Sequence, residues 1–153
     1  MNVTSNLIEV HIFRLAGEEL EFLLLKRAAH DIFPGLWQMV TGSIDNEEKA
    51  YEAAIREIKE ETGLTPVKFW VVPNVNSFYS PKQNQIYMVP VFAALVDCNI
   101  DVVISEEHSE YRWLSKEKAL QLLAWPGQRN SVETIYEYFT NQKNFLHFVE
   151  ISL

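Results

Sequence analysis

Three glutamates in one segment have a spacing that can build a metal site. Glu57, Glu60 and Glu61 are separated as i, i+3 and i+4, so in a helix their carboxylates leave the same side. Three negative charges so close together repel one another, and that face loses stability unless a counter-charge is bound. Magnesium is a hard cation that prefers oxygen ligands. The spacing therefore predicts one half of a Mg²⁺ site, with Mn²⁺ as an alternative, and a phosphate substrate would supply the remaining ligands.

The residues around these glutamates predict the helix that carries them. We expect a helix over 46–62, with Asp45 as its N-cap and Glu48 at the N3 position of a capping box. Gly63 suits the left-handed position that ends a helix. A stripe of apolar residues lies on the opposite side of the predicted helix and would pack against a sheet. The stripe consists of Ala50, Ala54 and Ile58.

The segment 42–64 resembles the signature of the Nudix hydrolases. That signature is G, five residues, E, seven residues, R-E, an aliphatic residue, any residue, E-E, any residue, G and an aliphatic residue. At a usage of roughly 0.06 per residue type, a chance match of its seven single-residue positions in such a chain is on the order of 10⁻⁷. The fixed positions are filled by Gly42, Glu48, Arg56, Glu57, Ile58, Glu60, Glu61, Gly63 and Leu64.

The resemblance implies a role for each polar residue of this signature. The metal ligands would be Glu57, Glu60, Glu61 and the backbone carbonyl of Gly42, a glycine that also suits a tight turn close to a ligand. Arg56 would orient a neighbouring glutamate, and Glu48 would be partly structural. These residues and their roles are taken from the family pattern and the printed sequence.

Two segments outside the signature resemble a narrower group, the dihydroneopterin triphosphate pyrophosphatases, also described as dATP pyrophosphohydrolases. Residues 37–44 read WQMVTGSI and are similar to W-Q-x-V-T-G-S-[VI], while residues 106–114 read EEHSEYRWL and are similar to E-H-x-x-Y-[KR]-W-L. The resemblance implies a further metal-binding carboxylate at Glu107 and phosphate contacts at Arg27 and Thr41. Either Glu57 or Glu107 would be the catalytic base that takes a proton from the attacking water.

Phe78 and Tyr79 lie in a segment, 73–85, that the sequence predicts to be a loop. Aromatic side chains in loops favour binding, and they suit a flat ring. We therefore expect these two residues in the substrate pocket. The predicted reaction is the Mg²⁺-dependent hydrolysis of a nucleoside or pterin triphosphate to a monophosphate and pyrophosphate.

Other functions within the same fold stay open at this point. One is a Nudix hydrolase that cleaves a dinucleoside polyphosphate, a nucleotide sugar or an oxidised nucleotide. Another is a Nudix domain that senses a nucleotide without cleaving it, although the intact signature favours an enzyme. The isomerase branch needs a catalytic cysteine, and nothing around Cys98 matches its motif.

Composition predicts one domain over residues 1–153. The formal charge of −8 argues against a nucleic-acid polymer or an anionic membrane as the main partner, and the expected partner is a small triphosphate. The single cysteine suits a reducing compartment, and the N-terminus has no signal-peptide pattern. We therefore expect a cytoplasmic protein, either a monomer or a homodimer.

Hydrophobic patterning predicts an alternation of strands and helices. This order fits an α/β class, and the resemblance implies an α/β/α sandwich with a mixed β-sheet between helices. The predicted strands are 7–15, 20–27, 36–40, 67–72, 86–96 and 111–114, and the predicted helices are 46–62, 115–124 and 130–141.

Overall fold

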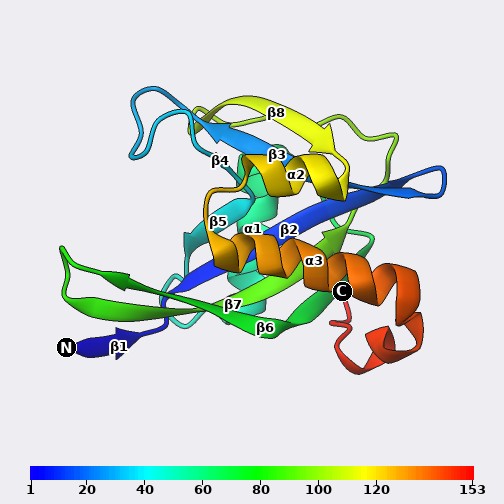
Figure 1. Ribbon diagram of the computed structural model, residues 1–153. Helices are drawn as coiled ribbons and strands as arrows, with labels where there is room; N and C mark the ends of the chain where they lie inside the picture. Colours follow the sequence, from blue (N-terminus) through cyan, green and yellow to red (C-terminus); the bar gives the residue numbers. More distant parts are fainter.

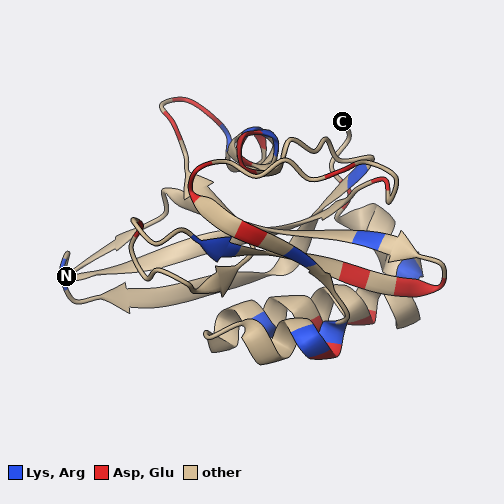
Figure 2. Ribbon diagram, turned by 90° about the horizontal axis from the view of Figure 1, so that it is seen from above, with Lys and Arg blue, Asp and Glu red and all other residues tan.

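The computed structural model describes residues 1–153 and contains a mixed β-sheet with helices on both faces (Figure 1). Helix α1 (Ala50–Thr62) covers one face, while α2 (Lys116–Leu122) and α3 (Pro126–Asn141) cover the other. Figure 2, a view from above, shows the sheet as the middle of three layers. The predicted α/β sandwich is therefore confirmed.

Strand β2 (Leu7–Ala16) lies at the centre of the sheet. It pairs antiparallel with β3 and β5 and parallel with β7, so the sheet is mixed. Strand β3 in turn pairs with β4 and β8, and β7 pairs with β1 and β6. The remaining strands are β1 (Asn2–Thr4), β3 (Glu19–Arg27), β4 (Trp37–Gln38), β5 (Val40–Ser43), β6 (Lys68–Ser80), β7 (Gln85–Leu95) and β8 (His108–Leu114).

The alternation of side chains along β2 builds a core on each face of the sheet. Ile8, Val10 and Ile12 pack in the cluster beneath α1, and Phe13 packs in the cluster beneath α3. On α1 itself, Ile58 is fully buried, which contributes roughly 1.5–3 kcal/mol to folding. This packing fixes α1 against the sheet and so fixes the direction in which its glutamates point.

Helix α1 ends where the sequence predicts but begins later. Gly63 caps its C-terminus in the left-handed conformation, with φ of 72°. The N-cap is Lys49, whose backbone N–H donates to the Glu52 carboxylate at 2.9 Å. The predicted capping box of Asp45 and Glu48 is therefore wrong as a helix start. These two residues close a turn before the helix, in which the Asp45 backbone N–H donates to the Glu48 carboxylate at 3.0 Å.

The last helix also differs from the prediction. Helix α3 begins at Pro126, four residues before the start of the predicted helix 130–141. Proline is tolerated in the first turn of a helix because the N–H that it lacks has no partner there. Ser115, the first residue of the predicted helix 115–124, is the N-cap of α2 and its side chain accepts from the Lys118 backbone N–H.

The largest difference concerns segment 73–85. Most of it is strand, because β6 continues to Ser80 and forms a long hairpin with β7 (Figure 1). The register shifts between Val71 and Val75, opposite Phe92 and Pro90. This irregularity accommodates Pro73, which cannot donate to a ladder. The predicted loop around Phe78 and Tyr79 is therefore wrong.

The C-terminal residues complete the fold in a way that the sequence did not indicate. A 3₁₀ helix (Lys143–Phe148) follows α3. The chain then returns to the free edge of β6, where the Ile151 N–H donates to the Phe69 carbonyl at 2.8 Å. No helix of this fold has the length and apolar character needed to cross a bilayer.

Candidate active site

The predicted acidic residues meet in an open cleft of about 330 Å³. Helix α1 contributes Glu57, Glu60 and Glu61, and the loop that precedes β8 contributes the other side. None of the lining residues is hydrophobic, and none is cationic. The six lining residues are Glu57, Glu60, Glu61, Ser105, Glu106 and Glu107.

Glu61 is the most unusual of these acids, because it is only 2% exposed and its Oε2 atom has no hydrogen-bond partner. Burial, together with the charges of Glu57 and Glu107, raises the pKa of Glu61 to about 9. Burial also raises the pKa of Glu57, against the opposing effect of Arg56. Negative charge is therefore unfavourable at this point, and a bound cation would remove that cost.

The donor set fits a hard divalent cation. Carboxylate oxygens of Glu61 and Glu107 lie within 4.8 Å of each other and of a ring nitrogen of His108. The orphaned Oε2 of Glu61 is a ready oxygen ligand, and Mg²⁺ and Mn²⁺ both accept carboxylates. The four predicted carboxylate ligands thus share one cleft.

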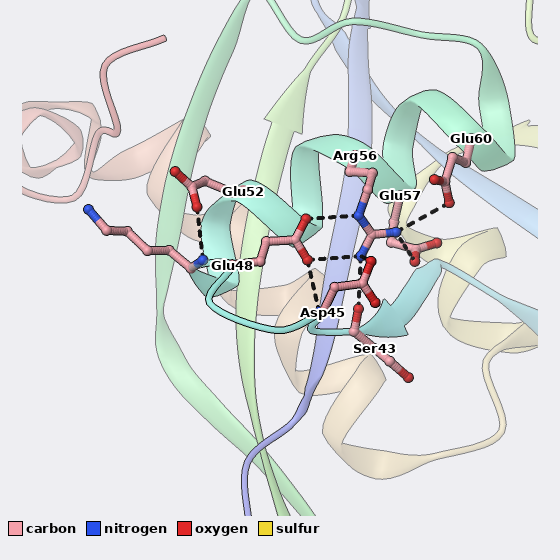
Figure 3. A network of polar contacts seen from close by, with 8 residues as sticks. Ser43, Asp45, Glu48, Glu52, Arg56, Glu57 and Glu60 are labelled. Atoms are coloured by element: carbon pink, nitrogen blue, oxygen red, sulfur yellow. Dashed lines mark hydrogen bonds and ion pairs between the residues drawn. The ribbon is translucent and has the colours of Figure 1, made fainter.

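Arg56 holds two of these acids in place (Figure 3). Its Nη1 atom donates to Glu57 at 2.8 Å and to Glu60 at 3.3 Å. Its Nε atom donates to Glu48 at 2.8 Å, which lowers the pKa of Glu48, and its Nη2 atom donates to the Ser43 carbonyl at 2.9 Å. These contacts support the orienting role implied for Arg56 and the structural role implied for Glu48.

Gly42 is required by the side chain of Glu57 rather than by a tight turn. It lies within β5, and a Cβ atom added there would stand 2.3 Å from Cδ of Glu57. Any larger residue would therefore push this carboxylate out of place. The contact keeps the Gly42 backbone beside a predicted metal ligand.

Neither predicted phosphate contact lines the acidic cleft. The Arg27 guanidinium is bound by protein groups, with Asp31 at 2.7 Å, Gln38 at 3.3 Å and the Ile32 carbonyl as acceptors. Thr41 pairs with Glu9 of β2, and Glu9 contacts α3 through Ser131. Since paired residues of neighbouring strands share a face, Thr41 points away from α1.

Phe78 and Tyr79 are not brought together either. As consecutive residues of β6 they point to opposite faces of the sheet, so they cannot both line one pocket. Phe78 stacks on Tyr87 with ring centroids 5.1 Å apart, and the Tyr79 hydroxyl donates to Asn84 at 3.0 Å. Neither belongs to the residues that line the acidic cleft.

Several residues at the site were not among the predicted ones. Ser105 and Glu106 line the cleft, although Glu106 reads from the sequence as a surface charge. The position of Ser105 and Glu106 next to Glu107 in the sequence could have indicated that they line the cleft. Gln38 and His108 contact each other at 3.2 Å behind the cleft, and only the pairing of β4 and β8 with β3 reveals that contact. Burial and the nearby Arg27 charge lower the pKa of His108 to about 4, so its ring is neutral at pH 7.

Comparison with known proteins agrees with this fold and site. A family model described as the NUDIX domain matches residues 6–135. The nucleoside triphosphatase NudI of Klebsiella pneumoniae (strain 342) is 34% identical over 111 residues, which cover 67% of this chain and 79% of that protein. The chain therefore belongs to the NUDIX family.

Solved structures with the same fold match most of the chain. A proposed NUDIX hydrolase from Listeria monocytogenes superimposes with a TM-score of 0.75 at 29% identity, covering 89% of this chain and 94% of that one. The dihydroneopterin triphosphate pyrophosphohydrolase of E. coli superimposes with a TM-score of 0.67 at 27% identity, covering 86% of this chain and 92% of that one.

Proposed function

We propose that this Nudix hydrolase cleaves a nucleoside triphosphate to a nucleoside monophosphate and pyrophosphate. The acidic cleft carries the proposal, because it gathers five carboxylates, three of them from a complete Nudix signature, and one of these three, Glu61, has a buried oxygen without a partner. The similarity to nucleoside triphosphatases supports a nucleoside triphosphate as substrate. The similarity to a dihydroneopterin triphosphate pyrophosphohydrolase keeps a pterin triphosphate as a second substrate of the same reaction.

Glu57, Glu60, Glu61 and Glu107 would hold Mg²⁺, or Mn²⁺ in its place, with the Gly42 carbonyl beside Glu57. The cation would neutralise the phosphate chain and acidify water. Arg56 keeps Glu57 and Glu60 at fixed positions. This arrangement accounts for the binding of a highly charged substrate in a cleft lined only by acids and one serine.

We assign the proton acceptor to Glu107 rather than Glu57. The Glu107 carboxylate has no hydrogen bond or ion pair with the protein, whereas Glu57 is held by Arg56 at 2.8 Å. A general base must approach the attacking water and accept its proton. A free carboxylate on a loop is suited to that movement, and a carboxylate fixed by arginine is suited to ligand binding.

Arg27 would stabilise charge that develops on the phosphates. Its guanidinium would have to exchange Asp31 for a phosphate oxygen, because Asp31 now lies 2.7 Å from it.

We also propose that residues 1–153 form a single Nudix domain and that the protein is located in the cytoplasm. The single exposed cysteine supports a reducing compartment.

A substrate panel tests the proposed reaction. The protein would be incubated with Mg²⁺ and a nucleoside triphosphate, a deoxynucleoside triphosphate, dihydroneopterin triphosphate, a dinucleoside polyphosphate or a nucleotide sugar, and products would be identified by phosphorus NMR. We expect a monophosphate and pyrophosphate from a triphosphate. Release of orthophosphate, or a clear preference for the last two substrates, would contradict the assignment.

A further inference from the structure

Behind the acidic cleft, a chain of polar side chains runs from Arg27 to Glu61. Arg27 donates to the side-chain oxygen of Gln38 at 3.3 Å, and the side-chain nitrogen of Gln38 lies 3.2 Å from Nε2 of His108. The same His108 atom lies 3.7 Å from Oε1 of Glu61. Gln38, His108 and Glu61 are all buried, so these contacts are shielded from water.

The direction of each hydrogen bond follows from Arg27. A guanidinium only donates, so the Gln38 oxygen faces Arg27 and the Gln38 amide N–H faces His108. Nε2 of His108 must then be the acceptor, and the ring proton is on Nδ1. The lone pair of Nε2 is used by Gln38, so Nε2 is not free to bind a metal, while Nδ1 is buried and has no hydrogen-bond partner. Although His108 lies among potential metal ligands, its hydrogen bond to Gln38 favours a role beside Glu61 over direct metal binding through Nε2.

His108 is also fixed through its backbone. It pairs with Arg27 in the β3–β8 ladder, and its N–H donates to the Ser105 carbonyl at 3.2 Å. The preceding carbonyl, that of Glu107, accepts from the Ala28 N–H at 3.0 Å. These contacts fix the backbone from which the ring projects, and the ring stands against the carboxylate of Glu61. At 3.7 Å the contact acts by packing and by limiting the directions in which that carboxylate can turn.

We propose that Gln38 and His108 are positioning residues that keep the Glu61 carboxylate turned towards the cation site. The proposal rests on the proposed metal-dependent function, because it gives these residues a role in metal affinity. Without the ring, the unpartnered Glu61 carboxylate would turn into the vacated space. Removal of groups that orient metal ligands typically weakens metal binding 10- to 100-fold.

The test measures Mn²⁺ affinity without substrate, from the electron paramagnetic resonance signal of the free aqueous ion. We expect His108→Ala to weaken binding by roughly 10- to 100-fold, and the near-isosteric Gln38→Met to weaken it by roughly tenfold. His11→Asn is the matched control, since His11 is equally buried and lies 2.9 Å from a different glutamate, Glu9. This control should bind Mn²⁺ within about twofold of the wild type.

Circular dichroism would establish which variants fold. If His108→Ala does not fold, the Mn²⁺ affinity of Gln38→Met tests the positioning role. Unchanged Mn²⁺ affinity in the folded variants would overturn the positioning role and leave the proposed reaction intact. An equal loss in His11→Asn would show a general effect of core substitution and would also overturn it. Failure of the wild type to bind Mn²⁺ would instead remove the metal site, and the proposed function with it.

Discussion

The two faces of the sheet each bury a glutamate near a histidine, and the two pairs differ in their hydrogen bonds. On the α3 face, Glu9 accepts from His11 at 2.9 Å, from Asn76 at 3.1 Å and from Ser131 at 3.1 Å. On the α1 face, Glu61 stands 3.7 Å from His108 and has an orphaned oxygen. One carboxylate is satisfied by the protein and the other is not.

The pKa shifts of the two glutamates have opposite signs for this reason. Burial acts to raise the pKa of Glu9, but the hydrogen bonds from His11, Asn76 and Ser131 outweigh it and hold the pKa below its usual value. Burial has no such compensation at Glu61, whose pKa rises to about 9. The comparison teaches that the number of donors, rather than the residue types, separates a structural carboxylate from one that awaits a ligand.

The largest expected effect is on turnover. Glu61→Gln and Glu57→Gln keep the side-chain shape but remove charged ligands, so kcat with Mg²⁺ should fall by about 10² or more. Folding would be verified by circular dichroism. Near wild-type turnover in both folded variants would show that the cleft is not the metal site.

Substitution of Glu107 should lower turnover more than substitution of the neighbouring acids. Glu107→Gln should lower kcat by about 10², because it removes the proposed base, while Glu106→Gln and Glu110→Gln should change it by less than about tenfold. Steady-state kinetics at saturating Mg²⁺ would measure all three variants. Equal and small effects at the three positions would show that these acids are solvent-exposed charges without a catalytic role.

On the other face, substitution should affect stability. Glu9→Ala leaves the donors of His11 and Asn76 without their acceptor, whereas Ser131 keeps the Gly127 carbonyl at 3.0 Å, and each buried unsatisfied group costs about 1–3 kcal/mol. We expect the free energy of unfolding in urea to fall by about 3 kcal/mol. In EDTA, Glu61→Gln should not destabilise the protein, since it replaces a carboxylate whose charge is unfavourable there. If Glu61→Gln lowers the free energy of unfolding more than Glu9→Ala does, Glu9 is not the structural carboxylate of the two.

The smallest effect expected is a pH dependence of metal-free stability. Glu61 keeps its proton in the folded state up to about pH 9 but loses it near pH 4.5 when unfolded. Between these values the unfolded state binds fewer protons, so stability falls as pH rises. His108, whose pKa is about 4 in the folded state against 6.5 when unfolded, acts in the opposite direction only between about pH 4 and pH 6.5.

Melting temperatures in EDTA between about pH 7 and 8.5 would therefore report the contribution of Glu61 without that of His108. The wild type should lose stability with rising pH more steeply than Glu61→Gln. Glu9 contributes nothing to this slope, because its lowered pKa makes its stabilisation complete above about pH 4.5 and lost only as pH falls. Parallel slopes for the wild type and Glu61→Gln would contradict the unfavourable charge at Glu61.

Local features of this site were predictable from the sequence. The positions of Glu57, Glu60 and Glu61 follow from helical periodicity, and the end of α1 follows from Gly63. Phe78 and Tyr79 were misplaced because Pro73, Pro90 and the polar residues between them mimic a loop, whereas a bulge lets the strand continue. Local sequence patterns do not report such a register shift.

Contacts that depend on strand register could not be predicted. Gln38 and His108 are 70 residues apart, and Glu9 and Ser131 are 122 residues apart. Each contact requires the pairing of β2, β3, β4 and β8 together with the docking of α3. For the same reason, the sequence did not distinguish Glu9 from an exposed glutamate of a strand or show that Asp31 holds Arg27.

Proton release on metal binding tests the central comparison most directly. A cation that binds the Glu61 carboxylate at pH 7.5 must displace its proton, so calorimetric titration with Mn²⁺ in buffers of different ionisation enthalpy should report about one proton released per ion. The Glu61→Gln variant should release about one proton fewer, while His11→Asn should behave as the wild type. Mn²⁺ binding by the wild type with no proton released, or with the same release from Glu61→Gln, would contradict the assignment of Glu61 as the unsatisfied metal ligand.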